Sequence, residues 1–224
     1  LGNMGVVQAR DMETEEVSEM VAQVGADALC VHMNPAMELI QPGGDRDFSG
    51  GLDTFQRLWA ELDVPVVAKE TGNGISREVA MQLRAIGIRH ADTSGAGGTS
   101  WVGVETLRAE GDGQALGEAL WDWGIPTAAS VRYCVEAGMT TIATGGIRSG
   151  MDVARAIALG ASCAGIARNV YQAYLEGGID GARSFLQRVE RELRSVMLLC
   201  GAKTIEDLQS APRVVTGELR DWIG

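Results

Sequence analysis

Polar side chains that could do chemistry follow short apolar runs at several points along the chain. His32 and Asn34 come at the end of the run 28–32 and lie two residues apart on an extended stretch. Side chains two apart on a strand face the same side, so both could offer neutral hydrogen bonds to one cavity or relay a proton there. A histidine that only caps a strand would be placed in the same way.

A second chemical group is the ammonium of Lys69, which ends the apolar run 64–69. Strand alternation puts this ammonium on the same face as the side chain of Val67. A cation at such a position needs an anionic partner to offset its loss of hydration. The partner is either a ligand anion or a neighbouring carboxylate, for which Glu70 and Asp92 are the candidates.

Glycine-rich loops follow the later apolar runs. Gly145 and Gly146 separate the run 140–144 from a helical pattern, and Gly165 opens a loop that reaches Arg168. Such loops let backbone N–H groups approach an oxyanion closely, and in parallel barrels the loops after the last strands are the usual phosphate site. The loop 94–100 holds three more glycines, so we expect it to move or to enclose a ligand.

These residues must be positioned by alternating strands and helices. The strand patterns are 5–7, 28–32, 64–69, 88–93, 140–144 and 163–166, and the helical patterns include 13–24, 76–86, 151–159 and 181–199. Several helical patterns end at a glycine of the kind that caps helices, namely Gly25, Gly87 and Gly160. Residues 123–129 are interpreted as a loop that leads into a further helix. Strict alternation predicts right-handed crossovers and a parallel sheet.

Six strands are too few to close an eight-stranded barrel. We therefore predict a single (β/α)8 TIM barrel domain over residues 1–224 that is incomplete at its N-terminus, with roughly 100 preceding residues absent, given the usual size of such barrels. An open, doubly wound α/β sheet is the alternative, and it would need no additional strands.

Composition excludes several classes of protein. With 46% hydrophobic and 22% charged residues, the 224-residue chain can bury one sizeable core. Its formal net charge of −11 argues against nucleic acid or an anionic membrane as a partner. No run approaches the roughly 18 apolar residues of a membrane span, so we expect a soluble cytoplasmic protein. The four cysteines lie far apart in apolar stretches and are expected to be reduced and buried.

Several sequence blocks at these strand ends occur together. They are Asn3-Met-Gly, His32-Met-Asn-Pro, Gln41-Pro-Gly-Gly-Asp-Arg-Asp-Phe, Lys69-Glu-Thr-Gly-Asn-Gly-Ile-Ser, Asp92-Thr-Ser-Gly-Ala-Gly-Gly-Thr-Ser-Trp, Gly145-Gly-Ile-Arg-Ser-Gly and Ala158-Leu-Gly-Ala. Together they resemble the type 2 isopentenyl diphosphate isomerases, FMN-dependent (β/α)8 enzymes, over essentially the whole chain. The glycine-pair block is shared with many FMN barrels, so it indicates the cofactor only.

The resemblance implies that FMN lies across the strand ends with its phosphate on the last two loops. Lys69 would lie near N1 and C2=O of the flavin, where a cation stabilises the anionic reduced ring. The cofactor-binding set that we predict is Asn3, Lys69, Thr93, Ser94, Gly98, Thr99, Gly145, Gly146, Arg148, Gly165, Ile166 and Ala167.

The resemblance also implies a substrate site. A prenyl diphosphate would bind a Mg²⁺ ion held by Glu38, and His32, Asn34, Lys69 and the residue before Glu38 form the predicted catalytic set. The implied reaction converts isopentenyl to dimethylallyl diphosphate with no net redox change, after NADPH has reduced the flavin. One residue departs from the family pattern: Met37 stands where the family has a glutamine, and a thioether is no useful proton donor or base.

Three other functions stay open. The first is a divergent flavoenzyme that isomerises or cyclises another prenyl diphosphate, and the second is a non-catalytic binding protein. The third, a 2-hydroxy acid oxidase, ranks low because its base histidine should follow a late strand, whereas His90 precedes its strand end. Apolar faces on the C-terminal helices predict a homo-oligomer, tetrameric or larger.

Overall fold

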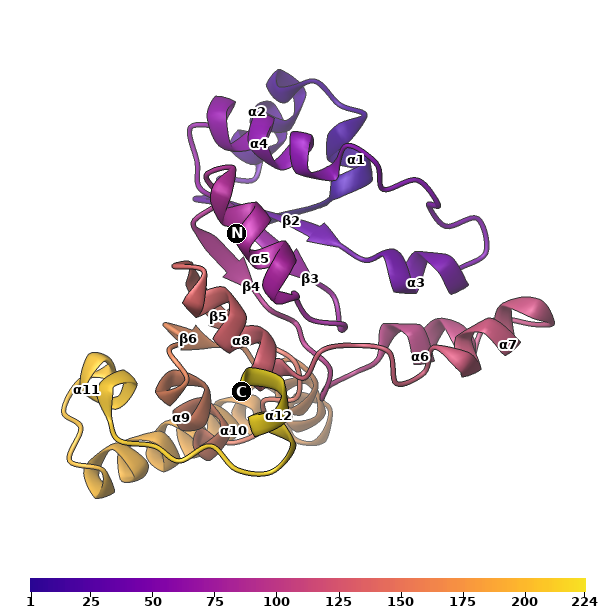
Figure 1. Cartoon of the computed structure of the whole chain (residues 1–224). Helices are drawn as coiled ribbons and strands as arrows, with labels where there is room; N and C mark the ends of the chain where they lie inside the picture. Colours follow the sequence, from indigo (N-terminus) through magenta and orange to yellow (C-terminus); the bar gives the residue numbers. More distant parts are fainter.

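The computed structural model describes residues 1–224 and contains one six-stranded parallel sheet (Figure 1). The strands are β1 (Gly2–Gly5), β2 (Leu29–Met33), β3 (Val66–Glu70), β4 (His90–Asp92), β5 (Thr140–Ala143) and β6 (Cys163–Ala164). Each strand pairs in parallel with the next one along the chain, in the order β1-β2-β3-β4-β5-β6. A doubly wound sheet reverses its strand order at a switch point. This sheet has no reversal, so the barrel type of winding is confirmed and the doubly wound alternative is wrong.

Helices connect and cover the strands. They are α1 (Val6–Arg10), α2 (Thr14–Gln23), α3 (Pro35–Ile40), α4 (Gly51–Glu61), α5 (Arg77–Ala85), α6 (Trp101–Thr106), α7 (Asp112–Ala119), α8 (Thr127–Glu136), α9 (Gly150–Ala158), α10 (Arg168–Leu199), α11 (Ile205–Ser210) and α12 (Glu218–Ile223). Helix α10 bends at Gly177 and Gly178, whose backbone angles are not helical. Helices α6 and α7 extend away from the sheet beside α3 (Figure 1).

The predicted position of the first strand is wrong. The run 5–7 was expected to be extended, whereas β1 ends at Gly5 and helix α1 begins at Val6. Val6 and Val7 are buried in the main core from this helix, next to Phe55 and Leu58 of α4. A short apolar run fits a buried strand and a buried helix equally well, so periodicity cannot separate the two.

The helix ends agree with the sequence patterns. Gly25, Gly87 and Gly160 all have positive φ, at 61°, 106° and 111°, where L side chains are disfavoured. Residues 123–126 form the predicted loop, and α8 starts at Thr127. The pattern 181–199 is the second half of α10.

The two largest apolar clusters lie behind the sheet and between the C-terminal helices. The larger packs β2, β3 and β4, through Val31, Ala68 and Ala91, against α2, α4 and α5. The second joins α9, α10 and α11. Because the larger core lies between the strands and the helices, the polar residues at the strand ends stay free to line a cavity.

The cysteines only partly match the expectation that all four are buried. All are free thiols, and Cys30 and Cys134 are buried, but Cys163 and Cys200 are exposed. Cys163 belongs to β6, which pairs on one side only, and Cys200 ends the long helix α10. No helix of the structure is both long and apolar enough to cross a bilayer.

Candidate active site at the strand ends

A cavity of about 420 Å³ lies at the C-terminal ends of the last four strands. Ten of the twelve predicted cofactor-binding residues line it, whereas two, Asn3 and Thr93, do not. Thr93 is fully buried, and its hydroxyl faces the backbone carbonyls of Ile142 and Thr144. The residues that line the cavity from the predicted set are Lys69, Ser94, Gly98, Thr99, Gly145, Gly146, Arg148, Gly165, Ile166 and Ala167.

Glycines make the backbone accessible in this cavity. Gly145 and Gly146 have φ of 100° and 76°. A Cβ atom on Gly146 would clash with the carbonyl oxygen of Gly97, and one on Gly98 would lie 2.6 Å from the amide nitrogen of Gly146. The two glycine loops therefore touch each other, and no larger residue fits at their contact.

Two guanidinium groups line the cavity without a carboxylate partner. Arg148 donates from Nη2 to the carbonyl oxygen of Gly97, at 3.0 Å. Arg168, the first residue of α10, forms no ion pair, and neither does Arg148. Unpaired cations beside close-packed backbone amides suit an anionic ligand group such as a phosphate.

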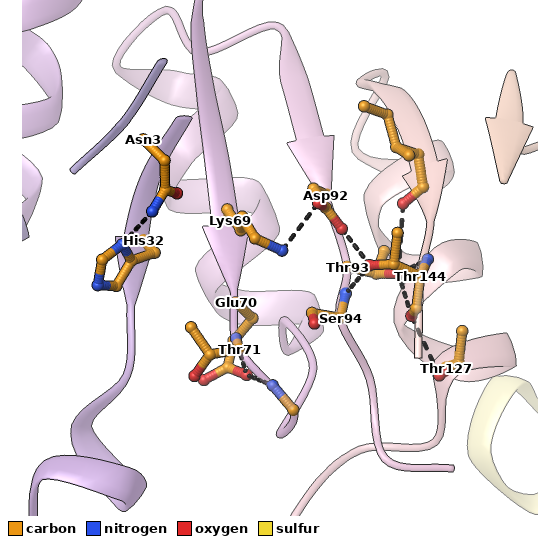
Figure 2. A network of polar contacts seen from close by, with 12 residues as sticks. Asn3, His32, Lys69, Glu70, Thr71, Asp92, Thr93, Ser94, Thr127 and Thr144 are labelled. Carbon is orange, nitrogen blue, oxygen red and sulfur yellow. Dashed lines mark hydrogen bonds and ion pairs between the residues drawn. The ribbon is translucent and has the colours of Figure 1, made fainter. Parts of the chain in front are cut away.

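Lys69 is joined to a carboxylate rather than left free. Its Nζ lies 2.9 Å from Oδ2 of Asp92 on the adjacent strand β4 (Figure 2). The other carboxylate oxygen, Oδ1, accepts a hydrogen bond from the hydroxyl of Thr144. Thr144 in turn accepts the backbone N–H of Ser94 at 2.9 Å. Of the two carboxylates that the sequence offers to Lys69, the structure uses Asp92.

Glu70 has a different partner. Its carboxylate is buried, and Oε2 accepts the backbone N–H groups of Thr71 and Gly72 at 2.6 and 2.7 Å (Figure 2). Burial raises the pKa of Glu70, although the backbone hydrogen bonds oppose that change. Glu70 thus fixes the loop that continues from β3 along the cavity.

His32 and Asn34 lie outside the cavity lining, and His32 lies on the side of Lys69 away from Thr144 (Figure 2). The amide of Asn3 lies 3.4 Å from Nδ1 of His32. Burial, and then the charge of Lys69, lower the pKa of His32, so the neutral imidazole is favoured. A neutral ring can accept from Asn3 at Nδ1 and keep a proton on Nε2.

Met37 and Glu38 lie on helix α3, which packs against α6 through Ala36, Ile40 and Val102. Met37 is half-buried. Both oxygens of Glu38 accept hydrogen bonds, Oε1 from the Asn34 amide at 2.7 Å and Oε2 from the Asp45 N–H at 3.0 Å.

The metal-binding chemistry of these residues is limited. No group of three His, Cys, Asp or Glu side chains in the structure could hold a metal ion. Glu38 is the carboxylate that the sequence assigned to the metal. One carboxylate is the number that Mg²⁺ often uses when substrate phosphates and water supply its other ligands.

The predicted set leaves out several residues that the structure places on the cavity. A signal for some of them was present, because they stand next to predicted residues in the same loops. Thr71 is distinct, since its buried hydroxyl oxygen has no hydrogen-bond partner. The added lining residues are Thr71, Gly72, Gly95, Trp101, Thr144, Ile147, Arg168 and Asn169.

Solved structures of similar architecture include flavin enzymes. A mandelate oxidase variant with an FMN adduct superposes with a TM-score of 0.62 at 22% identity, over 88% of this chain and 57% of the other. GMP reductase from Trypanosoma brucei gives a TM-score of 0.65 at 24% identity, over 96% of this chain and 46% of the other. At such identities the likeness shows the shared fold alone.

Sequence relatives are closer. Isopentenyl-diphosphate delta-isomerase from Methanothermobacter thermautotrophicus is 46% identical over 227 residues, and the enzyme of that name from Thermococcus onnurineus is 44% identical over 232 residues. Both alignments cover 100% of this chain but 62% of the relative. The chain thus spans less than two thirds of the length of these relatives.

The family profile described as FMN-dependent dehydrogenase matches residues 52–215, which include the cavity and both phosphate-type loops. The curated relatives described above, and a further one from Thermococcus kodakarensis at 43% identity, carry the name isopentenyl-diphosphate delta-isomerase. On these matches, the chain belongs to the FMN-dependent dehydrogenase family and resembles, within it, the isopentenyl-diphosphate delta-isomerases.

Proposed function

We propose that the cavity binds FMN, with the phosphate on the loops at Gly145 and Gly165 and the ring toward Lys69. The observation that carries this proposal is the pairing of close-packed glycine amides with the unpaired guanidinium groups of Arg148 and Arg168. A phosphate dianion would satisfy those groups, which no carboxylate of the chain does. The unpartnered hydroxyl of Thr71 offers a further hydrogen bond after a change of rotamer.

We infer that the full-length protein isomerises isopentenyl diphosphate to dimethylallyl diphosphate, as the names of its relatives indicate. Bound reduced flavin would supply the electron-rich ring at which the allylic protons are exchanged. The protein's own contribution is to hold an ammonium, Lys69, at the ring. It would also hold a neutral imidazole, His32, beside the substrate region.

We further propose that Glu38 takes part in a Mg²⁺ site together with the substrate diphosphate. Asn34, which donates to Glu38, would orient that carboxylate. NADPH is the proposed reductant. A cytoplasmic location and a homo-oligomer, tetrameric or larger, complete the proposal.

A hydroxy-acid oxidase is a poorer match to the site. Such chemistry needs a base histidine at the cavity, and His90 is the first residue of β4, at the opposite end of that strand from Asp92. His90 is also absent from the cavity lining.

Met37 favours a second candidate, a flavoenzyme that isomerises or cyclises a different prenyl diphosphate. A half-buried thioether on α3 cannot transfer a proton, so the step assigned to the family's glutamine would need another group.

The test is product analysis with the full-length protein, FMN, Mg²⁺ and NADPH. We expect isopentenyl diphosphate to give dimethylallyl diphosphate. Met37→Gln should raise the rate of this reaction by at least about tenfold, a cautious figure because one acid–base group usually contributes about a hundredfold or more. A Met37→Leu variant controls for side-chain volume. If neither the native protein nor Met37→Gln forms the product, the isomerase proposal is wrong.

A further inference from the structure

Ser94 has an unusual backbone conformation at the mouth of the cavity. It is the only residue other than glycine with positive φ, at 35°. Positive φ is disfavoured for L residues, and it persists only where neighbouring groups hold it. The N–H of Ser94 donates to Oγ1 of Thr144 at 2.9 Å, and its carbonyl oxygen accepts the N–H of Gly74 at 3.2 Å.

The direction of each hydrogen bond around Ser94 follows from the groups involved. The N–H of Ser94 can only donate, so Thr144 Oγ1 accepts it. The one hydroxyl proton of Thr144 then points to Oδ1 of Asp92. The ammonium of Lys69 also only donates, and it does so to Oδ2. Asp92 is therefore the acceptor at both ends, which requires a carboxylate.

Asp92 occupies the place in the sheet from which one side chain can reach two neighbouring strands. It pairs with Lys69 of β3 on one side and with Ile142 of β5 on the other. Its own side chain does not line the cavity, whereas Lys69, Ser94 and Thr144 all do. Figure 2 shows Asp92 between Lys69 and Thr144. The carboxylate thus acts on the cavity only through groups that it holds.

We propose that Asp92 is a positioning residue that fixes two parts of the cavity lining at once. It holds the ammonium of Lys69 directly, and it holds the positive-φ backbone of Ser94 through the hydroxyl of Thr144. Its role toward the flavin rests on the proposed function. The role toward Lys69 and Ser94 does not, since all of its contacts lie within the chain.

Two nearly isosteric variants separate the two arms of this network, namely the contact from Asp92 to Lys69 and the contact from Asp92 through Thr144 to Ser94. Thr144→Val removes the hydroxyl and keeps the shape, so it breaks the link to Ser94 and leaves Lys69 paired with Asp92. Asp92→Asn leaves one acceptor oxygen for two donors and removes the charge, so it disturbs both arms. Thr144→Ser retains the hydroxyl and is the conservative control. Asp63→Asn, an exposed carboxylate before the start of β3, is the control for loss of charge.

Crystal structures of the full-length variants without added flavin give the first readout. We expect Ser94 to leave the positive-φ region in Thr144→Val and to keep it in Thr144→Ser. In Thr144→Val the distance from Lys69 Nζ to Asp92 Oδ2 should stay near 2.9 Å. In Asp92→Asn both Lys69 and Ser94 should shift. Ser94 with unchanged φ in Thr144→Val would overturn the proposal, even if Asp92→Asn fails to fold.

The bound flavin gives a second readout that a merely structural residue would not change. Asp92→Asn removes the negative charge beside Lys69, so the reduction potential of bound FMN should become more positive than in the native protein. Thr144→Val should leave that potential unchanged and raise the dissociation constant of FMN about tenfold, the cost of one misplaced hydrogen-bonding group. Equal potentials in the two variants would contradict the assignment of Asp92. If the native protein binds no FMN, the proposed function fails, and the crystal structures still decide the role of Asp92.

Discussion

Lys69 and Glu70 are neighbours of opposite charge, yet they do not pair with each other. Adjacent residues on a strand point to opposite faces, so the ammonium reaches Asp92 and the cavity while the carboxylate of Glu70 reaches the backbone of its own loop. Each charge is therefore compensated locally. Lys69 is paired with Asp92 and also lines the cavity, where its charge can act on a ligand.

Replacement of this lysine tests its assigned place. Lys69→Ala should raise the dissociation constant of FMN about tenfold to a hundredfold, because a hydrogen bond from a charged group is worth roughly 1.5–3 kcal/mol. The matched control is Lys203→Ala, which changes the other lysine of the chain, an exposed residue before α11. Fluorescence titration of FMN measures both. Equal affinities in the two variants would remove Lys69 from the flavin site.

His32 makes a prediction about pH. Its pKa is lowered from the ordinary 6.5, so the unfolded chain takes up a proton that the folded protein resists as pH falls through that value. Stability contributed by neutral His32 is therefore present above the ordinary pKa and is lost as pH falls toward the depressed one.

The measurement is urea unfolding between about pH 7.5 and 5.5, a window centred on the ordinary histidine pKa. The native protein should lose more free energy of unfolding across this window than His32→Gln does. The chain has two histidines, so His90→Gln is the matched control. A steeper loss in His32→Gln than in the native protein would contradict a lowered pKa for His32.

The residue types at the strand ends predicted the cavity better than they predicted its internal contacts. The requirement that Lys69 has an anionic partner was sufficient to name Glu70 and Asp92 as candidates. Strand alternation could have excluded Glu70, because adjacent side chains on a strand point to opposite faces. The hydroxyl of Thr144 and the positive φ of Ser94 gave no signal in the sequence, since both depend on neighbouring strands.

At the scale of elements, the cavity depends on two loops in van der Waals contact. Gly98 and Gly146 touch because neither has a side chain, and the guanidinium of Arg148 bonds to the first loop at Gly97. The loops after β4 and β5 therefore form one unit that presents amides to the ligand.

A pair of glycine substitutions tests this contact. Gly25→Ala, at the end of α2, places a Cβ in open space, so it should cost only the left-handed backbone penalty, roughly 1–2 kcal/mol. Gly146→Ala adds a clash with the backbone of Gly97 and should cost clearly more. It should also abolish FMN binding, which Gly25→Ala should leave unchanged. Thermal unfolding and FMN titration compare the two, and equal destabilisation would mean that the loops separate freely.

Helices with clear caps and five of the six predicted strands lie close to their predicted positions, whereas the first apolar run does not. Gly25, Gly87 and Gly160 marked helix ends because few other residues accept positive φ. The run 5–7 was assigned to a strand, although Val6 starts a helix that buries its side chains against α4. Only the packed structure distinguishes these outcomes, since both bury the same residues.

At the scale of the whole molecule, the strand order accounts for the position of the site. All six strands run parallel in chain order, so their C-terminal ends lie at one edge and their loops converge there. The net charge of −11 does not prevent anion binding, because the anion site is built from local amides and cations. The alternation of strands and helices predicted the parallel sheet, whereas the strand order of the structure separates the barrel from the doubly wound alternative. The sequence could not show which of the predicted residues stay out of the cavity, as Asn3 and Thr93 do.

The most direct test of the central claim, that the cavity at the strand ends holds FMN, is the visible absorption spectrum of the full-length gene product as purified and after addition of FMN and gel filtration. We expect flavin bands that stay with the protein and are absent from Gly146→Ala, whose added Cβ lies within the loop contact. A protein that retains no flavin after reconstitution would contradict the account. Equal retention by Gly146→Ala would place the flavin elsewhere.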